Sequence, residues 1–268
     1  MKIGIIGIGV VGGAVKFGFE ALGHTVKFHD TKYNTSLKDV LDTEICYICV
    51  PTPIGDNGKC NISIVEEVIE ELYHNNYEGI IAIKSTVVPG TTKNIKEKYK
   101  NLNICFVPEF LRERCAIPDF CENHDLLVIG TEDKTVFELI KKSHGKYPKK
   151  IIQVSETEAE FCKYFNNIYN AVLITFANSF YEVCKASNVD YSNIKDTIVN
   201  RENILDKYLD CNENLRGFGG MCLPKDTTAI AALVKQLNLD IEFFDMILSE
   251  NEKYKTTVFN GMRKWKKY

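Results

Sequence analysis

A glycine-rich turn near the amino terminus constrains the fold more than any other feature of the chain. The β-branched run from Lys2 to Ile6 predicts a strand, and it leads directly into Gly7-Ile8-Gly9-Val10-Val11-Gly12. A helix is predicted from Val11 to Leu22 and a second strand from Thr25 to His29, with Asp30 at its end. A strand, a glycine turn, a helix, a strand and an acidic residue in this order are typical of a dinucleotide-binding βαβ unit.

Each glycine of this turn has a physical task in such a unit. Gly7 makes the turn, Gly9 lets a pyrophosphate approach the backbone, and Gly12 lets the helix pack closely on the sheet. The start of the helix offers unpaired N–H groups and partial positive charge to the phosphates. Asp30 would accept hydrogen bonds from ribose hydroxyls and repel a 2′-phosphate, which favours NAD over NADP, although Lys32 nearby works against that choice. The alternative is a glycine turn in some other α/β protein.

Strands and helices then alternate as far as residue 155. Further strands are predicted at Ile45–Val50, Ile80–Lys84, Ile104–Val107, Leu126–Gly130 and Ile151–Val154. Helices are predicted between them at Ser63–Leu72, Thr91–Tyr99 and Lys134–Ser143. This alternation predicts a doubly wound parallel sheet of Rossmann type with helices on both faces. We therefore predict an NAD-binding domain over residues 1–155.

The pattern changes at Glu156. A stretch without glycine or proline predicts one long helix from there to Ala186. Further helices are predicted at Asn193–Leu209, Thr227–Leu237 and Ile241–Trp265, with no further strand. Residues 156–268 are therefore predicted to form an all-α domain, whose long helix could serve as a face for pairing with a second copy.

Three proline-stiffened turns follow predicted strands of the sheet. They are Val50-Pro51-Thr52-Pro53, the segment from Ser85 and Thr86 to Thr91, and Pro108-Glu109-Phe110-Leu111-Arg112-Glu113. Each by itself is an ordinary strand-to-helix turn with a Ser, Thr or Glu cap. Ligands of parallel sheets bind beyond the carboxyl ends of the strands. Three such turns at one edge, beside a dinucleotide turn, predict a pocket there.

A second glycine-rich stretch delivers a cysteine to the start of a predicted helix. Gly217-Phe218-Gly219-Gly220-Met221-Cys222 is followed by Leu223-Pro224-Lys225-Asp226. The glycines permit positive φ and a close approach to a ligand. A helix N-terminus and Lys225 both favour the thiolate of Cys222, and Asp226 is near enough to hold a water or a proton beside the sulfur. The alternative is a plain loop in which Asp226 caps the helix and the cysteine is packed and inert.

Two polar residues of the predicted long helix complete the candidate chemistry. Lys163 and Asn167 are four residues apart, so they project from one helical face. A lysine and an amide that point inward suit the stabilisation of an oxyanion. The alternative is a pair of solvated surface side chains.

Composition excludes several other classes of protein. The net charge of -3 gives no basic footprint for a nucleic acid, and no apolar run reaches the length of a bilayer span. Met1-Lys2 leads straight into a strand, without the features of a signal peptide. The ten cysteines are spread along the chain, and the Cys46-x-x-Cys49 pair lies in a predicted buried strand without the second pair that a zinc site needs. We therefore expect reduced thiols, no metal and a cytoplasmic location.

Taken in order, these segments resemble the UDP-glucose/GDP-mannose dehydrogenase family. The resemblance runs from residue 1 to about residue 237. Its motifs are the first glycine turn, the three proline turns, Glu158-Ala159-Glu160 with Lys163-Tyr164 and Asn167, and the second glycine stretch with Cys222, Pro224, Lys225 and Asp226.

The resemblance implies oxidation of a nucleotide-sugar C6 alcohol to a carboxylate by two NAD, of the kind that converts UDP-glucose to UDP-glucuronate for polysaccharide biosynthesis. Cys222 would capture the intermediate aldehyde as a thiohemiacetal, and the next oxidation would give a thioester that water hydrolyses. The other catalytic residues implied are Lys163 and Asn167 for the oxyanions, Asp226 with a water for proton transfer, and Glu109 and Thr86 for hydrolysis of the thioester.

The resemblance also implies two sets of binding residues and a homodimer formed through the helical domain. The cofactor contacts implied are Gly7, Gly9, Val10, Val11, Gly12, Asp30, Lys32, Val50, Pro51, Thr52, Ser85, Thr86 and Glu113. The substrate contacts implied are Phe110, Leu111, Lys163, Asn167, Gly217, Phe218 and Gly219.

The sequence departs from the family pattern at several points. Those before Gly217 are Val107 in place of an Asn, Arg112 and Arg114 in place of small residues, and a substrate-binding arginine whose role Arg201 or Arg216 would have to fill. Met221 and Leu223 flank the cysteine where Ser and Phe are usual. We also expect the family's C-terminal nucleotide-binding domain to be lacking. Two alternatives follow: a two-domain NAD-dependent dehydrogenase of a smaller hydroxy compound, and a non-catalytic NAD-binding subunit.

Overall fold

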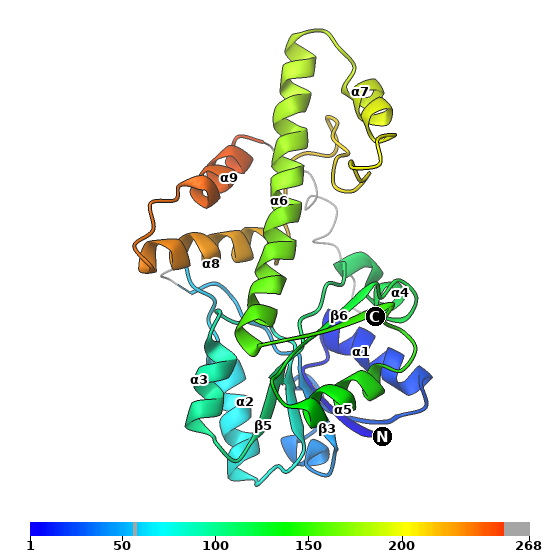
Figure 1. Cartoon of the computed structure of the whole chain (residues 1–268), viewed down its shortest axis with the longest axis vertical. Helices are drawn as coiled ribbons and strands as arrows, with labels where there is room; N and C mark the ends of the chain where they lie inside the picture. Colours follow the sequence, from blue (N-terminus) through cyan, green and yellow to red (C-terminus); the bar gives the residue numbers. More distant parts are fainter. Residues whose placement is uncertain (56–57, 255–268) are drawn as a thin grey trace. The chain divides into compact units, whose positions relative to one another are not determined.

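The computed structural model describes residues 1–55 and 58–254, which form two compact units. The first unit consists of Met1–Pro53 and Cys60–Lys163. The second consists of the Ile54–Lys59 segment and the chain from Tyr164 on. The long helix α6 (Glu156–Ala186) begins in the first unit and continues into the second (Figure 1).

The first unit is built on a seven-stranded sheet with strand order β2-β1-β3-β4-β5-β6-β7. The strands are β1 (Lys2–Ile6), β2 (Thr25–His29), β3 (Ile45–Ile48), β4 (Ile80–Ile83), β5 (Asn103–Phe106), β6 (Leu126–Gly130) and β7 (Lys150–Val154). The strands from β2 through β5 in this order all run parallel to their neighbours. The predicted doubly wound sheet is therefore confirmed.

One edge of the sheet departs from the predicted all-parallel arrangement. β6 pairs antiparallel with β5, through Phe106 and Gly130, and β7 is parallel to β6. The connection between β5 and β6 therefore begins and ends at the edge where the carboxyl ends of β1 to β5 lie. It contains a 3₁₀ turn, η2 (Glu113–Cys115), and the short helix α4 (Ala116–Cys121), neither of which the sequence pattern predicted.

The remaining helices of the first unit are the ones that hydrophobic spacing predicted. They are α1 (Val10–Ala21), α2 (Ser63–His74), α3 (Thr91–Lys98) and α5 (Lys134–His144), together with an unpredicted 3₁₀ turn, η1 (Leu37–Val40). In Figure 1, α2 and α3 cover one face of the sheet, whereas α1 and α5 cover the other. The predicted ends of these helices differ from the observed ends by a few residues at most.

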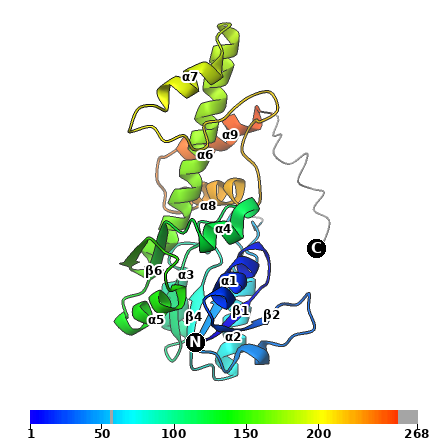
Figure 2. The same cartoon turned by 90° about the vertical axis from the view of Figure 1, so that its right-hand side faces the viewer.

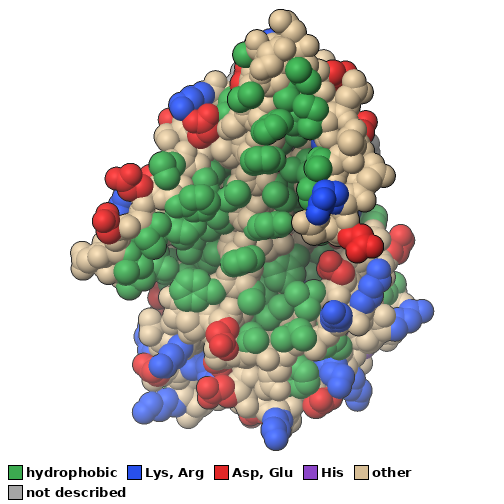
Figure 3. Space-filling model, turned by 45° about the horizontal axis from the view of Figure 1, so that its top comes forward, with side chains coloured by type: hydrophobic (Ala, Val, Ile, Leu, Met, Phe, Trp, Pro, Cys, Tyr) green, Lys and Arg blue, Asp and Glu red, His purple; other side chains and the backbone are tan. Residues whose placement is uncertain are grey.

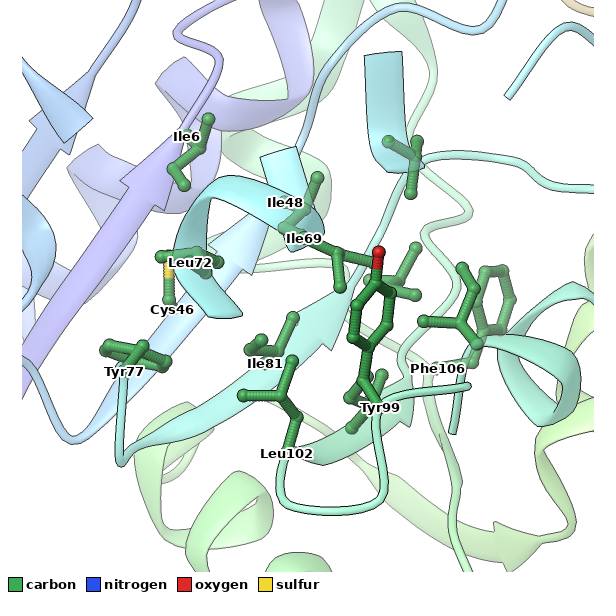
Figure 4. Packing of buried hydrophobic residues seen from close by; sticks show 14 of the residues in the cluster. Ile6, Cys46, Ile48, Ile69, Leu72, Tyr77, Ile81, Tyr99, Leu102 and Phe106 are labelled. Carbon is green, nitrogen blue, oxygen red and sulfur yellow. The ribbon is translucent and has the colours of Figure 1, made fainter. Parts of the chain in front are cut away.

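Two hydrophobic clusters fill the two faces of the sheet. Successive residues of β4 alternate between them: Ile80 and Ala82 pack with α1, α4 and α5, whereas Ile81 and Ile83 pack with α2 and α3. Figure 4 shows the cluster on the face that α2 and α3 cover, in which Leu72 of α2 lies over the strands. Because side chains of a strand point alternately to opposite faces, a sheet covered on both sides requires continuous apolar strands, as this sequence has.

Two buried histidines predict that the first unit loses stability in mild acid. Burial lowers the pKa of His144 well below its usual value and that of His124 to about 4, and the charge of Lys84 acts in the same direction. In the unfolded chain both titrate near pH 6.5, so below that pH the unfolded state binds more protons than the folded one. The free energy of unfolding should then fall as the pH drops from about 6.5 toward 4, by about 1.4 kcal/mol per pH unit for each histidine.

Urea denaturation at a series of pH values measures this slope. His144 packs among the rings of Phe19, Tyr47 and Phe120, so His144→Phe preserves the packing and should remove one histidine's share of the slope. His74→Asn, on the exposed end of α2, is the matched control for the removal of a histidine. A His144→Phe variant that loses stability as steeply as the parent would contradict the assignment.

The regular elements of the second unit, within the residues that the structure describes, are helices, and the isolated bridge between Asn212 and Leu215 belongs to no strand. Besides α6 the unit contains α7 (Tyr191–Ile198), α8 (Leu223–Gln236) and α9 (Phe243–Glu252). Figures 1 and 2 show α8 and α9 on one side of α6, and α7 at its far end. The predicted all-α region and the predicted bounds of α6 are confirmed. No helix in this described part of the chain, or in the first unit, is long and apolar enough to cross a bilayer.

Three predicted helix boundaries in this unit need comment. The helix predicted over Asn193–Leu209 is wrong beyond Ile198, because the side chain of Asn200 donates hydrogen bonds to the last carbonyls of α7 and ends it. α8 begins at Leu223, four residues earlier than predicted. The helix predicted to reach Trp265 is present as α9, and the prediction beyond residue 254 lies outside the described residues.

Candidate active site

The glycine turn between β1 and α1 has the geometry that a dinucleotide requires. Gly7 has a φ of 90°, and a Cβ there would lie 2.6 Å from the carbonyl oxygen of Cys49. A Cβ at Gly12 would lie 1.9 Å from the carbonyl oxygen of Gly7. A Cβ at Gly9, in contrast, would meet no atom within 4 Å. There is therefore no room for a side chain at Gly7 or Gly12, whereas the space beside Gly9, where a pyrophosphate would approach, is empty.

Asp30 lies beside this turn. The backbone N–H of Ile8 donates to Asp30 Oδ2 at 2.7 Å, and that of Lys32 donates to Asp30 Oδ1 at 2.8 Å. A carboxylate has about four acceptor positions, so both oxygens can still accept from ribose hydroxyls. Gly9 is the N-cap of α1 and offers no side-chain cap, which leaves the first N–H groups of the helix to an anion. The residues present fit a bound NAD.

Substitution of Gly9 tests this fit. Gly9 has a negative φ of -82°, so alanine can adopt its backbone conformation, and the new methyl group would occupy the open space. We expect Gly9→Ala to weaken NAD binding about tenfold or more, while stability stays the same or rises by about 0.5 kcal/mol. Calorimetric titration with NAD and urea denaturation check the two parts.

The matched control is Gly13→Ala, one turn further along α1. Its new Cβ would also meet no atom within 4 Å. This variant should bind NAD like the parent, so the comparison separates the position of Gly9 from a general effect of added methyl groups. Unchanged NAD affinity in Gly9→Ala would argue against a pyrophosphate at this turn.

The turns after β3 and β4 are held together by two side chains. Ser85 Oγ donates to the carbonyl oxygen of Val50 at 2.7 Å. The buried thiol of Cys60 donates to the carbonyl oxygen of Thr86 at 3.2 Å and to that of Thr52 at 3.6 Å. The predicted cofactor residues on these two turns are therefore close neighbours. Cys60 was not singled out from the sequence, where nothing distinguishes it from the other buried cysteines.

Lys163 and Glu109 form a buried ion pair in the first unit. Lys163 Nζ lies 2.9 Å from Glu109 Oε1 and 2.7 Å from the carbonyl oxygen of Glu109. The two side chains are 5% and 11% exposed. The other carboxylate oxygen of Glu109 accepts from the backbone N–H of Leu111 at 2.7 Å, which fixes the turn after β5. The alternative of a solvated surface lysine is therefore wrong, and two of the predicted catalytic residues are in direct contact.

A second buried carboxylate anchors the base of α6. Glu160 accepts hydrogen bonds from the backbone N–H groups of Gly90 and Thr92 and from the hydroxyl of Thr92. These groups lie at the start of α3, where a carboxylate satisfies unpaired N–H donors. Glu160 thereby ties α6 to the turn that carries Ser85 and Thr86, and Lys163 follows on the same helix three residues later.

Cys222 stands apart from the other cysteines. All ten cysteines lie in the described residues, and Cys222 alone is exposed. It is the N-cap residue of α8, where the partial positive charge of a helix N-terminus favours a thiolate. Desolvation, in contrast, raises the pKa of Cys49 to about 12, so that thiol of the Cys-x-x-Cys pair stays protonated at neutral pH.

Asp226 is at the centre of a polar cluster in the second unit. It is fully buried in the first turn of α8, and its carboxylate accepts from Asn167 Nδ2 at 2.6 Å and from Lys225 Nζ at 2.5 Å. Its backbone N–H donates to the carbonyl oxygen of Cys222 at 2.8 Å. The alternative in which Asp226 caps the helix beside a packed cysteine is therefore wrong. The structure thus brings together Asn167 and Asp226, both predicted as catalytic, and adds Lys225, which the sequence had placed only beside the thiol.

Four other residues considered from the sequence lie outside these two polar clusters. Lys32 and Glu113 are exposed, so their contact with a cofactor stays a prediction. Arg201 is exposed on the segment after α7, whereas Arg216 is buried. Arg216 Nε donates to Asn178 Oδ1 at 2.9 Å, so this guanidinium attaches the segment around Arg216 to α6.

Two models of one protein family match the chain. Residues 27–147 match the NAD binding domain of the UDP-glucose/GDP-mannose dehydrogenase family. Residues 157–253 match the central domain of the same family. The first match contains Asp30, the Thr52 and Thr86 turns and Glu109, and the second contains Lys163, Asn167, Cys222 and Asp226.

Individual relatives point the same way. The UDP-glucose 6-dehydrogenase of Rickettsia bellii is 31% identical over 246 residues, covering 89% of this chain and 55% of the relative. The GDP-mannose 6-dehydrogenase of Pseudomonas aeruginosa is 30% identical over 241 residues, covering 83% and 54%. The chain thus spans about half the length of the curated relatives it matches.

The fold is also shared with a solved structure. A UDP-glucose dehydrogenase from the hyperthermophilic archaeon Pyrobaculum islandicum superposes with a TM-score of 0.85 at 25% identity, covering 94% of this chain and 68% of that one. The two family models together span most of the chain, and the first describes the cofactor domain as one that binds NAD. With NAD as its cofactor, the chain belongs to the UDP-glucose/GDP-mannose dehydrogenase family.

Proposed function

We propose that the chain catalyses the NAD-dependent oxidation of a nucleotide-sugar C6 alcohol to a carboxylate, of the UDP-glucose to UDP-glucuronate type. The observation that carries the proposal is the exposure of Cys222, alone among ten cysteines, at the N-terminus of a helix whose first turn contains buried Asp226. Relatives that act on UDP-glucose and on GDP-mannose support the substrate class.

The proposed chemistry uses Cys222 as a covalent anchor. Bound NAD supplies a hydride acceptor for each of the two oxidations. After the first, the Cys222 thiolate adds to the aldehyde carbon and the oxygen takes up a proton, which gives a thiohemiacetal. Oxidation of that adduct gives a thioester, and water then displaces the thiol. The sum is one alcohol, two NAD and one water giving one carboxylate, two NADH and three protons.

Two polar pairs would assist these steps. Asn167 and Lys225 hold the carboxylate of Asp226 in place. Held there, the carboxylate would take up or return a proton through a water. Lys163 would stabilise the oxyanions of the addition and hydrolysis steps, together with Asn167. Glu109, fixed by Lys163, would assist hydrolysis of the thioester with a water held by Thr86.

Binding of the sugar nucleotide is proposed on the segments that the family resemblance indicates. These are Phe110 and Leu111 of the turn after β5, Lys163 and Asn167 of α6, and Gly217, Phe218 and Gly219 of the second glycine stretch. The chemistry requires a primary alcohol on the sugar. It does not by itself choose between a uridine and a guanosine nucleotide, and the relatives include enzymes of both kinds.

Formation of NADH with a panel of substrates tests the proposal. The panel contains UDP-glucose, GDP-mannose and a set of small hydroxy acids without a nucleotide. We expect two NADH per sugar nucleotide oxidised and no turnover of the small hydroxy acids. A chain that binds NAD but oxidises only a small hydroxy acid would support the two-domain alternative. One that binds NAD and oxidises nothing would support a non-catalytic subunit.

We also propose that the chain forms a homodimer through its helical unit. Exposed apolar side chains form a stripe along α6: Phe165, Tyr169, Phe176, Phe180 and Val183. At 100° per residue, these positions fall within about 60° of one another around the helix. Figure 3 shows hydrophobic side chains gathered over this part of the molecule. A monomer rarely exposes so many apolar residues together, and a second copy presenting the same stripe would cover them.

Sedimentation experiments test the dimer. Phe165 is 76% exposed, so Phe165→Glu should leave the fold intact and shift the chain toward a monomer. A parent chain that sediments as a monomer at micromolar concentration would contradict the proposal. A cytoplasmic location stays a prediction.

A further inference from the structure

The glycine stretch before Cys222 contains no helix or strand, and an asparagine of α9 holds it. The backbone N–H of Phe218 donates to Asn251 Oδ1 at 2.7 Å, and Asn251 Nδ2 donates to the carbonyl oxygen of Phe218 at 2.9 Å. The side-chain amide therefore pairs with both backbone groups of Phe218, as a neighbouring strand would. Neither contact was apparent from the sequence, because the two residues are 33 positions apart.

A second asparagine holds the residues just before Phe218. Asn178 of α6 is buried, and its Oδ1 accepts from the backbone N–H of Gly217 at 3.1 Å and from Arg216 Nε at 2.9 Å. Its Nδ2 donates to the carbonyl oxygen of Ile174 at 2.9 Å, which fixes the orientation of the amide. The stretch is thus attached to two different helices of the same unit.

Packing strengthens the attachment on both sides. The Arg216 guanidinium lies 4.7 Å from the ring centre of Tyr181 and 5.2 Å from that of Tyr254. The Phe218 ring is buried against Ala171 and Ile247. Residues 216–218 therefore form a fixed stem. The residues that follow this stem are more exposed to solvent: Gly219 and Gly220 are half-buried, and both Met221 and Cys222 are exposed.

We propose that Asn251 is a positioning residue for Cys222, acting through the Phe218 peptide. The inference rests on the proposed function, because it assigns to Asn251 the task of keeping the thiol where the substrate is oxidised. Glycines lose more conformational freedom on ordering than other residues, so a stretch with three of them needs external anchors to hold one shape. Cys222 lies four residues after Phe218, so the loss of this anchor is transmitted along a short and otherwise pliable segment.

Native-state proteolysis with chymotrypsin measures the anchor without reference to activity. The bond after Phe218 is protected while the ring is buried, so its cleavage reports opening of the stem. We expect Asn251→Ala to speed cleavage at this bond about tenfold or more, since two hydrogen bonds are lost. Asn251→Asp is the isosteric variant: it keeps the acceptor for the Phe218 N–H but loses the donor to the Phe218 carbonyl, and it should also cleave faster than the parent.

The matched control is Glu252→Ala, at the next position of α9, where the side chain is exposed. Its cleavage rate at Phe218 should equal that of the parent. NADH formation is then measured with the same variants. Both Asn251 variants should lower kcat about tenfold or more while leaving the KM for NAD unchanged, because the glycine turn of the first unit is not touched. A general loss of folded protein would lower cleavage resistance at all sites, not at Phe218 alone.

The outcomes separate this inference from the proposed function. Cleavage after Phe218 at the parent rate in both Asn251 variants would overturn the anchor, whatever the activity. Faster cleavage with unchanged kcat would overturn the positioning role. If the parent chain oxidises no nucleotide sugar, the proposed function fails, and with it the catalytic consequence. The cleavage rates would still decide whether Asn251 holds the stretch.

Discussion

Cys222→Ser is expected to lower net NADH formation from a nucleotide sugar by about a thousandfold or more. A serine hydroxyl is not ionised near neutral pH, so it neither captures the aldehyde efficiently nor leaves readily from the acyl adduct. Serine is also a preferred N-cap residue, and Cys222 occupies the N-cap position of α8. The substitution should therefore leave stability unchanged or slightly higher, so that the loss of activity is chemical in origin.

Steady-state rates and thermal unfolding of the same samples check both parts. Cys121→Ser is the control, because Cys121 is half-buried at the end of α4 and has no proposed role in the reaction. It should keep the parent turnover. Turnover by Cys222→Ser within a few-fold of the parent would exclude a covalent intermediate at this position.

Lys163→Met should cost both activity and stability. The substitution leaves the buried carboxylate of Glu109 without its cation, and removal of one partner from such a pair typically costs about 3–5 kcal/mol. The loss of a group that stabilises oxyanions should also lower turnover by about a hundredfold or more. Urea denaturation and NADH formation measure the two effects separately.

The double variant Lys163→Met with Glu109→Gln distinguishes the two roles of the lysine. Once the Glu109 side chain is neutral, it no longer carries a buried charge that lacks the Lys163 ammonium, so most of the lost stability should return. Turnover should not return, because the cation and the carboxylate proposed for hydrolysis are both absent. Full additivity of the two stability losses would show that the ion pair seen here does not govern stability.

Much of the first unit is predictable because its signals are local. The turn at Gly7 and Gly12 needs glycine for reasons of space that the structure now shows, and a glycine turn between a strand and a helix is visible in the sequence alone. The bounds of α6 were also predicted, since thirty-one residues without glycine or proline leave little choice. The spacing of Lys163 and Asn167 on that helix singled them out as a candidate pair, and both side chains are buried.

What the sequence did not reveal depends on contacts between distant residues. Cys60 and Asn251 act through hydrogen bonds to backbone groups more than twenty residues away. Helix α4 is six residues long, too short for a hydrophobic period to be recognised, so the antiparallel step from β5 to β6 was missed with it. The end of α7 is set by the Asn200 side chain, a local signal that helical spacing does not contain.

The most direct measurement is mass spectrometry of the chain after incubation with UDP-glucose or GDP-mannose and NAD. Glu109→Gln should be examined beside the parent, since slower hydrolysis of the thioester would let the adduct accumulate. The account predicts that peptide mapping finds the mass of an oxidised sugar nucleotide on Cys222, only when NAD is present, and more of it in Glu109→Gln. Oxidation of the sugar with no adduct in either protein, or with the adduct on another residue, would contradict it.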